Sequence, residues 1–215
     1  MSLQTDNTIG LNPERIAADI EAITRLSDST LRAAVTRTWI AALEKGGYAS
    51  FDGIPVSTGL RNRSLLQHVN DVNSLALYLL QLSQTSFGLD PDWDTTLAAA
   101  ILHDVDKAFI QRRTDSGSVA YVDGYTMRDH GPAGAALAQA YGIPEAVCEL
   151  VRNHAPFNYD GHLPPTIEGT IIHYADLTAF DLAANQSGAP PIHARSILLK
   201  KDHPLLRQVR EIEAY

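Results

Sequence analysis

Six histidine and aspartate side chains carry the chemistry that this sequence suggests. The most prominent are the adjacent His103 and Asp104, which directly follow the apolar run LAAAIL, with Lys107 one turn later. The other candidates are spaced on either side, at His68, His130, His154 and Asp176. Imidazole nitrogens and carboxylate oxygens are the ligands that borderline or hard divalent metals prefer. Six such groups exceed what one metal with open positions needs, but they suit two neighbouring ions.

Each candidate also has an ordinary structural explanation when it is taken alone. A lone inward-facing His68 can be a hydrogen-bonded core residue, and His130 and His154 lie at predicted helix ends, where histidines often act as caps. Asp176 differs because it lies among apolar residues, where an unpaired carboxylate is costly to bury. The adjacent histidine and aspartate raise the same difficulty. Since the candidates lie on separate helices or helix ends, their combination favours a metal centre.

Helical signals dominate the elements that must position these residues. Apolar periodicity and capping residues predict helices over 13–26, 29–46, 64–86, 90–104, 132–141, 144–153 and 166–185. Residues 48–63 predict a loop. Residues 111–127 are polar and glycine-containing, with a short alternating run that predicts a hairpin or lid. We therefore expect an all-α, single-domain helical bundle.

Charge and composition narrow the classes of partner. The chain has 215 residues, 45% of them apolar, with a net charge of −8 and a sequence pI of about 5.4. The basic residues are scattered, which makes a nucleic-acid partner unexpected and favours a small molecule. No apolar run has the length of a membrane span, and the N-terminus lacks the features of a signal peptide. With one cysteine, Cys148, which cannot form an internal disulfide, these features predict a cytoplasmic location.

The spacing of the candidates resembles that of the HD-domain metal-dependent phosphohydrolase superfamily, over roughly residues 60–185. The supporting segments are SLLQHVNDVNSLAL, AAAILHDVDKAF, DHGPAGAALAQAYGIPEAVCELVRNHA and IIHYADLTAFD. The resemblance implies a helical bundle of the HD-domain type with the metal site at its centre. It also suggests an HD domain over 61–190, with an N-terminal helical extension over 1–60 and a C-terminal tail over 191–215.

The resemblance further implies a binuclear ligand set. By that match, one ion would be held by His68, His103, Asp104 and Asp176. The other would be held by His130, His154 and Asp104. Asp104 would bridge the two ions, because a carboxylate offers two oxygens whereas imidazole offers one nitrogen at a time. Iron or manganese is the expected metal, and nickel, cobalt, zinc and magnesium remain open.

The sequence departs from the family pattern in places that bear on function. The usual HD-apolar-Gly-Lys context has Asp106 in place of its glycine. Ala155 stands where some nuclease and cyclic-dinucleotide branches carry a second histidine. The GYP signature of the cyclic-di-GMP branch is also missing, since Thr126 follows Gly124-Tyr125. These departures argue against cyclic-di-GMP cleavage and against a nuclease.

The resulting expectation is a metal-dependent phosphohydrolase that acts on a phosphoester of a small metabolite or nucleotide. A water shared by both metals would be the nucleophile, with Asp104 and Lys107 as catalytic residues. Candidate substrate contacts are Lys107, Arg112, Arg128 and His173. Specificity is expected to lie in residues 48–63 and 111–127.

Two other functions are compatible with the same residues. One is an HD-type mixed-valence di-iron oxygenase, which would use O₂ to cleave a C–C or C–P bond. The other is a non-catalytic metal-binding sensor domain, although the ligand loss typical of such domains is not seen here. A homo-oligomer is compatible with each of these functions.

Overall fold

The computed structural model describes residues 10–57, 60, 63–155 and 165–188. Its helices are α1 (Pro13–Asp19), η1 (Glu21–Arg25), α2 (Ser29–Gly46), α3 (Leu65–Phe87), α4 (Trp93–Leu102), α5 (Lys107–Ile110), η2 (Met127–Asp129), α6 (Pro132–Ala140), α7 (Glu145–Asn153) and α8 (Ile167–Gln186). Two short strands, β1 (Gln111–Arg113) and β2 (Val119–Tyr121), form a small antiparallel sheet. Within these described ranges, no helix combines the length and apolarity that a membrane span requires.

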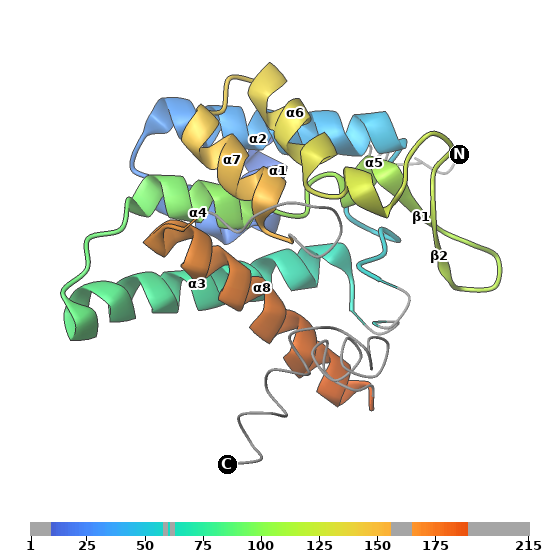
Figure 1. Ribbon diagram of the computed structural model, residues 1–215. Coiled ribbons are helices and arrows are strands. Elements are labelled where there is room, and N and C mark those ends of the chain that lie inside the picture. Colours follow the sequence, from blue (N-terminus) through green and yellow to red (C-terminus); the bar gives the residue numbers. More distant parts are fainter. Residues whose placement is uncertain (1–9, 58–59, 61–62, 156–164, 189–215) are drawn as a thin grey trace, which may run out of the picture.

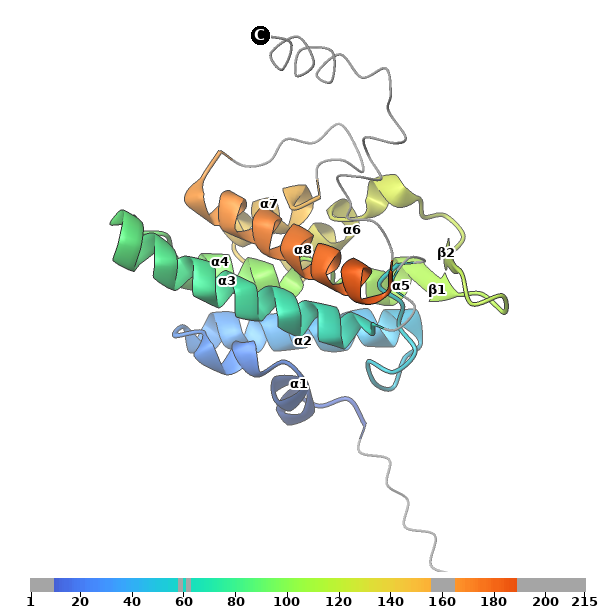
Figure 2. The same ribbon diagram turned by 90° about the horizontal axis from the view of Figure 1, so that it is seen from below.

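The helices form a bundle around α4, which confirms the expected all-α fold. Figure 1 shows α4 between α3 and α8 on one side and α2, α6 and α7 on the other. The helix pairs α3–α8 and α6–α7 pack directly on each other. Figure 2 shows α1 and α2 on the side of α3 away from α6 and α7, with the β1–β2 hairpin projecting beside α5.

The apolar run that precedes His103 explains why α4 is central. Every residue from Thr96 to Leu102 is fully buried, so this helix has no solvent-facing side within that stretch. A helix that is apolar all round is stable only when other elements surround it. His103 and Asp104 directly follow the end of α4, so both polar residues lie in the middle of the bundle.

Local capping interactions set several of the predicted helix boundaries. Asn12 accepts a hydrogen bond at the start of α1, and Asp28 caps α2. Ser64 forms a capping box with Gln67 at the start of α3, the helix that carries His68. These interactions satisfy backbone N–H groups that have no partner inside the helix. They confirm the expected starts of all three helices.

The first helix is shorter than predicted. Regular α-helix ends at Asp19, and the chain continues after Ile20 as the 3-10 turn η1. Helix ends are commonly tightened by 3-10 hydrogen bonds, in which the N–H of one residue donates to the carbonyl oxygen three residues earlier. Here the Ile23 N–H donates to the Ile20 carbonyl oxygen. Ile16, Ile20 and Ile23 all remain fully buried, so the change of helix type keeps the apolar side on the core.

The N-terminal elements share the core of the helices that carry the site. Ile16 and Trp39 belong to the same apolar cluster as Leu97 and Ile101. The Trp39 indole N–H also donates to the Ile101 carbonyl oxygen at 3.2 Å. The domain limits suggested at residues 60 and 190 stay a prediction, and the C-terminal tail over 191–215 lies outside the described residues.

Candidate metal centre

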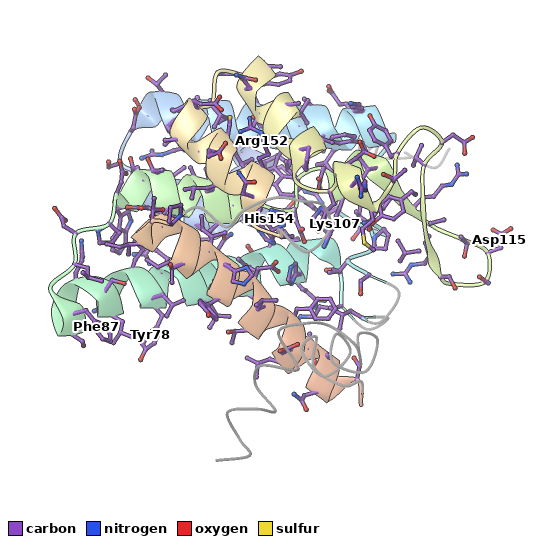
Figure 3. All side chains as sticks on the ribbon, in the orientation of Figure 1. Tyr78, Phe87, Lys107, Asp115, Arg152 and His154 are labelled. Carbon is purple, nitrogen blue, oxygen red and sulfur yellow. The ribbon has the colours of Figure 1, made fainter. Side chains whose placement is uncertain are left out.

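The six predicted ligand residues come together from five separate parts of the chain. His68 projects from α3, His103 and Asp104 follow α4, and Asp176 lies on α8. His130 lies between η2 and α6, and His154 follows α7. Their ligand atoms form two groups in which all atoms lie within 4.8 Å of one another: His68, His103 and Asp176, and then Asp104, His130 and His154. Figure 3 shows His154 and Lys107 near each other in the interior of the bundle.

The carboxylate of Asp104 connects the two groups. Its Oδ2 lies 3.3 Å from His68 Nε2 and 3.4 Å from His103 Nε2. Its Oδ1 lies 3.4 Å from His130 Nε2 and 3.7 Å from His154 Nε2. Since the residue is only 1% exposed, both oxygens face protein groups rather than solvent. One carboxylate thus presents one oxygen to each histidine pair.

Hydrogen bonds to Nδ1 fix which nitrogen His103 and His154 present to the site. The Nδ1 atom of His103 lies 2.7 Å from the Ala100 carbonyl oxygen, and that of His154 lies 2.8 Å from the Val151 carbonyl oxygen. A carbonyl oxygen can only accept, so the proton is on Nδ1 and the neutral ring keeps a lone pair on Nε2. Such outer hydrogen bonds are typical of metal-binding histidines.

Buried atoms in the site lack the partners that their chemistry requires. Asp104 Oδ1 and His154 Nε2 are both buried, and no described residue hydrogen-bonds to either of them. Leaving a buried acceptor unsatisfied typically costs about 1–3 kcal/mol. A divalent cation satisfies several converging lone pairs at once, and nitrogen and oxygen donors of this kind suit such an ion. The residues present therefore fit a metal centre.

The electrostatics of the centre follow from its burial and its mixture of charges. Burial lowers the pKa of His68, but the nearby carboxylates of Asp104 and Asp176 outweigh it and raise that pKa to about 9. For Asp104, burial acts to raise the pKa, but the charge of Lys107 holds it well below its usual value. Asp176 behaves similarly, since its hydrogen bond with His68 keeps its pKa low against the effect of burial. Both carboxylates are thus ionised and available to a cation at neutral pH.

Lys107 is held directly against the bridging carboxylate. Its Nζ donates to Asp104 Oδ2 at 2.8 Å, although the lysine side chain itself is almost buried. Burial lowers the pKa of Lys107, but the charges of Asp104 and Asp176 outweigh this and raise it. The ammonium therefore keeps its positive charge beside the proposed metal ligands.

A cavity of about 200 Å³ opens onto the centre. It is lined by Val56, Ser57, Lys107, Gln111, Tyr121, Met127, His130, His154, Ala155, His173, Asp176, Leu177 and Phe180. The two segments expected to carry specificity, 48–63 and 111–127, both contribute to this wall. A pocket of this size beside the ligand cluster suits a small molecule.

The suggested substrate contacts differ in where the structure places them. Lys107 and His173 line the cavity, and His173 Nδ1 donates to the His154 carbonyl oxygen at 3.1 Å. Arg112 and Arg128 are both exposed, and neither belongs to the cavity wall. Strand alternation explains the position of Arg112, because its neighbour Gln111 takes the inward position on β1.

Two cavity residues and one buried acid were not singled out as functional from the sequence. Gln111 and Tyr121 are paired in the register of the β1–β2 hairpin, and both line the cavity. The Gln111 Oε1 atom is buried, and no described group hydrogen-bonds to it. The acid is Asp106, which was noticed only as a departure from the expected glycine. Its fully buried position beside His103 and Asp104 is a signal that the apolar context LAAAILHDVD already contains.

Comparison with known proteins agrees with this geometry. The chain matches the HD domain family over residues 65–181, which is more than half of its length. It therefore belongs to the HD domain family, as the resemblance suggested. It is also similar to the dihydroneopterin 2′,3′-cyclic phosphate phosphodiesterase of Methanocaldococcus jannaschii, with 27% identity over 130 residues. The match covers 59% of this chain and 51% of that enzyme, so the chain spans about half the length of this relative. No solved structure matches the chain significantly.

Proposed function

We propose that this protein is a metal-dependent phosphohydrolase with two divalent ions at the centre described above. The observation that carries the proposal is the position of Asp104, whose two oxygens face two separate histidine pairs. Membership of the HD domain family and similarity to a phosphodiesterase support the same reaction class. When bound, two such ions supply Lewis acidity and activate a water near neutral pH.

The ligands would divide between the ions as the two groups of side chains do. One ion would be held by His68, His103, Asp104 and Asp176. The other would be held by Asp104, His130 and His154. Iron or manganese is the metal we expect at these imidazole and carboxylate donors, and nickel, cobalt, zinc and magnesium are alternatives.

The chain's own residues around the cavity would bind and orient the phosphoester. Lys107 is charged and lines the cavity, so its ammonium can hold a phosphate oxygen and stabilise negative charge that develops there. His173 lines the cavity beside His154, where it can contact the substrate or hold the His154 backbone in place. The exposed Arg112 and Arg128 would act only on parts of a substrate that reach outside the cavity.

The substrate we propose is a small phosphoester with a ring system attached. The relative's name describes a cyclic phosphodiester of a pterin. In this chain, Tyr121 and Phe180 give the cavity aromatic walls that suit a planar ring. The buried Gln111 Oε1 offers an acceptor for a hydroxyl or N–H group of that substrate.

The experiment that tests this function is metal add-back to chelator-treated protein. The substrates would be 2′,3′-cyclic nucleotides, nucleoside monophosphates and p-nitrophenyl phosphate, and hydrolysis would be followed by ³¹P NMR. We expect hydrolysis to return with iron or manganese and to stay absent in Asp104→Asn, which keeps the side-chain shape. The proposal fails if no ion in the panel supports hydrolysis of any phosphoester, or if Asp104→Asn is as active as the wild type. Oxygen uptake measured on the same samples distinguishes the di-iron oxygenase.

A further inference from the structure

Asp106 links the turn after α4 to the segment that carries His130. The residue is fully buried and lies between α4 and α5. Its Oδ1 lies 3.1 Å from His130 Nδ1, and its Oδ2 accepts from the Gly131 backbone N–H at 2.6 Å. The Asp106 carboxylate thus contacts His130 and Gly131, which lie far from it in the sequence. His130 is itself a member of the second ligand group.

This contact determines what His130 presents to the centre. Both Asp106 oxygens face N–H positions, of His130 Nδ1 and of the Gly131 backbone, so the geometry points to a His130 proton on Nδ1. Its Nε2 is then left with a lone pair, and this atom lies 3.4 Å from Asp104 Oδ1. A carboxylate behind an imidazole also makes the ring a stronger donor to a metal.

Asp106 differs from the groups that orient the neighbouring rings. His103 and His154 donate their Nδ1 protons to backbone carbonyl oxygens, which any sequence could supply. His130 instead depends on a side chain, at a position where the family pattern has a glycine. A glycine there has no side-chain oxygen to offer, so this contact with His130 is a feature of this chain's own sequence.

We propose that Asp106 is a positioning residue that fixes the Nδ1-protonated form of His130 and so strengthens the second metal site. This inference rests on the proposed binuclear centre and adds a residue to it that acts through His130. Its oxygens are already occupied by His130 and the Gly131 N–H, so Asp106 acts from behind the ring rather than as a ligand.

The competing explanation is that Asp106 only holds the turn before α6. Gly131 has a φ of 93°, and the bond from its N–H to Asp106 helps to fix this unusual backbone. The two explanations differ in what Asp106→Asn should change. The asparagine oxygen can still accept from the Gly131 N–H, but its NH₂ group then faces His130 Nδ1. Because two donors cannot pair, His130 is driven to the form with its proton on Nε2.

The test uses ¹H–¹⁵N NMR of the histidine rings and metal titration of the full chain with Mn²⁺. In metal-depleted wild type, we expect the His130 proton on Nδ1, and in Asp106→Asn we expect it on Nε2. Asp106→Asn should weaken the second Mn²⁺ by about 10- to 100-fold and leave the first within about threefold. Thermal unfolding of the metal-depleted variant, with Asp90→Asn at an exposed loop position as the control, measures any loss of fold.

Three results would overturn the inference. The first is a proton on His130 Nε2 in the wild type, which is informative even if the variant does not fold. The second is an unchanged tautomer in a folded Asp106→Asn. The third is equal weakening of both ions, which would show that the substitution acts on the whole centre and not through His130. None of these readouts needs hydrolysis, so a failure of the proposed reaction would leave this inference standing if two ions bind.

Discussion

His68 and His103 face each other through their Nε2 atoms at 3.3 Å, between the carboxylates of Asp104 and Asp176. The His103 ring carries its proton on Nδ1, which donates to the Ala100 carbonyl oxygen. The Nε2 atom of His103 therefore has no proton and carries a lone pair. Two bare nitrogens at this distance repel each other unless a positive group lies between them. Either a proton on His68 or a shared metal ion can supply that charge, which makes proton release a direct consequence of metal binding.

Metal binding is accordingly expected to weaken as the pH falls. The pKa of His68 is raised to about 9, so the protonated form dominates at lower pH and its proton must leave before Nε2 can bind an ion. Below that pKa, each pH unit should weaken the first ion by about tenfold for one released proton. Calorimetric titration of metal-depleted protein with Mn²⁺, in buffers of different ionisation enthalpy, counts the released protons. An affinity that stays constant from about pH 8 down to about pH 6.5 would contradict the assignment.

Replacing a single ligand histidine by alanine should remove one ion and leave the other bound. His130→Ala or His154→Ala should deplete mainly one ion, since these residues belong to the group on Asp104 Oδ1. His68→Ala should deplete the other, because its Nε2 faces Asp104 Oδ2 and Asp176. Elemental analysis of the purified variants would show about one ion per chain in each case. If one of these variants retained both ions, the division of ligands proposed above would be wrong.

Lys107→Met tests whether the ammonium acts on the substrate. Methionine keeps the length of the side chain and loses the charge, so we expect kcat to fall by about 10²-fold while both ions remain bound. Steady-state kinetics and metal content of the same sample provide both readouts. Lys45→Met is the matched control, since Lys45 is exposed and its Nζ lies 4.1 Å from the centre of the Phe109 ring. A kcat within about twofold of the wild type would remove Lys107 from the proposed mechanism.

Gly131→Ala should destabilise the fold beside His130. A Cβ at this position would lie 2.5 Å from the Arg152 carbonyl oxygen, and the φ of 93° already disfavours any side chain. We expect a loss of about 2 kcal/mol or more in the free energy of unfolding, measured by urea denaturation. Gly124→Ala separates the two causes, because Gly124 has a φ of 90° but open space around it. Equal losses in the two variants would show that contact with Arg152 contributes nothing.

Local and periodic features explain why the fold could be predicted from the sequence. The fully apolar stretch before His103 indicates a central helix, and caps such as Asp28 and Ser64 mark the helix starts. The polar segment over 111–127 forms the expected hairpin between Gln111 and Tyr121. The change to a 3-10 turn after Ile20 was not predicted, because the apolar spacing is the same for both kinds of helix.

The site was predictable only where residue type alone carries the information. The six histidines and aspartates were predicted as ligands from their residue types and from a spacing that resembles that of the HD family. The structure brings all six together. The contact between Asp106 and His130 was missed because it joins segments that only the folded chain places side by side. The exposure of Arg112 could not be predicted, because it depends on which face of strand β1 points inward. A strand of three residues is too short for its sequence pattern to show which face is buried.

The measurement that tests the central claim most directly is the metal content of the wild type and of Asp104→Ala, both purified without a metal-affinity column. Two ions per chain are expected in the wild type. Asp104→Ala should lose both, because its carboxylate faces both histidine pairs. Asp90→Ala, at an exposed loop position, should keep both. A wild type without bound metal after incubation with iron or manganese, or a fully loaded Asp104→Ala, would contradict the binuclear centre.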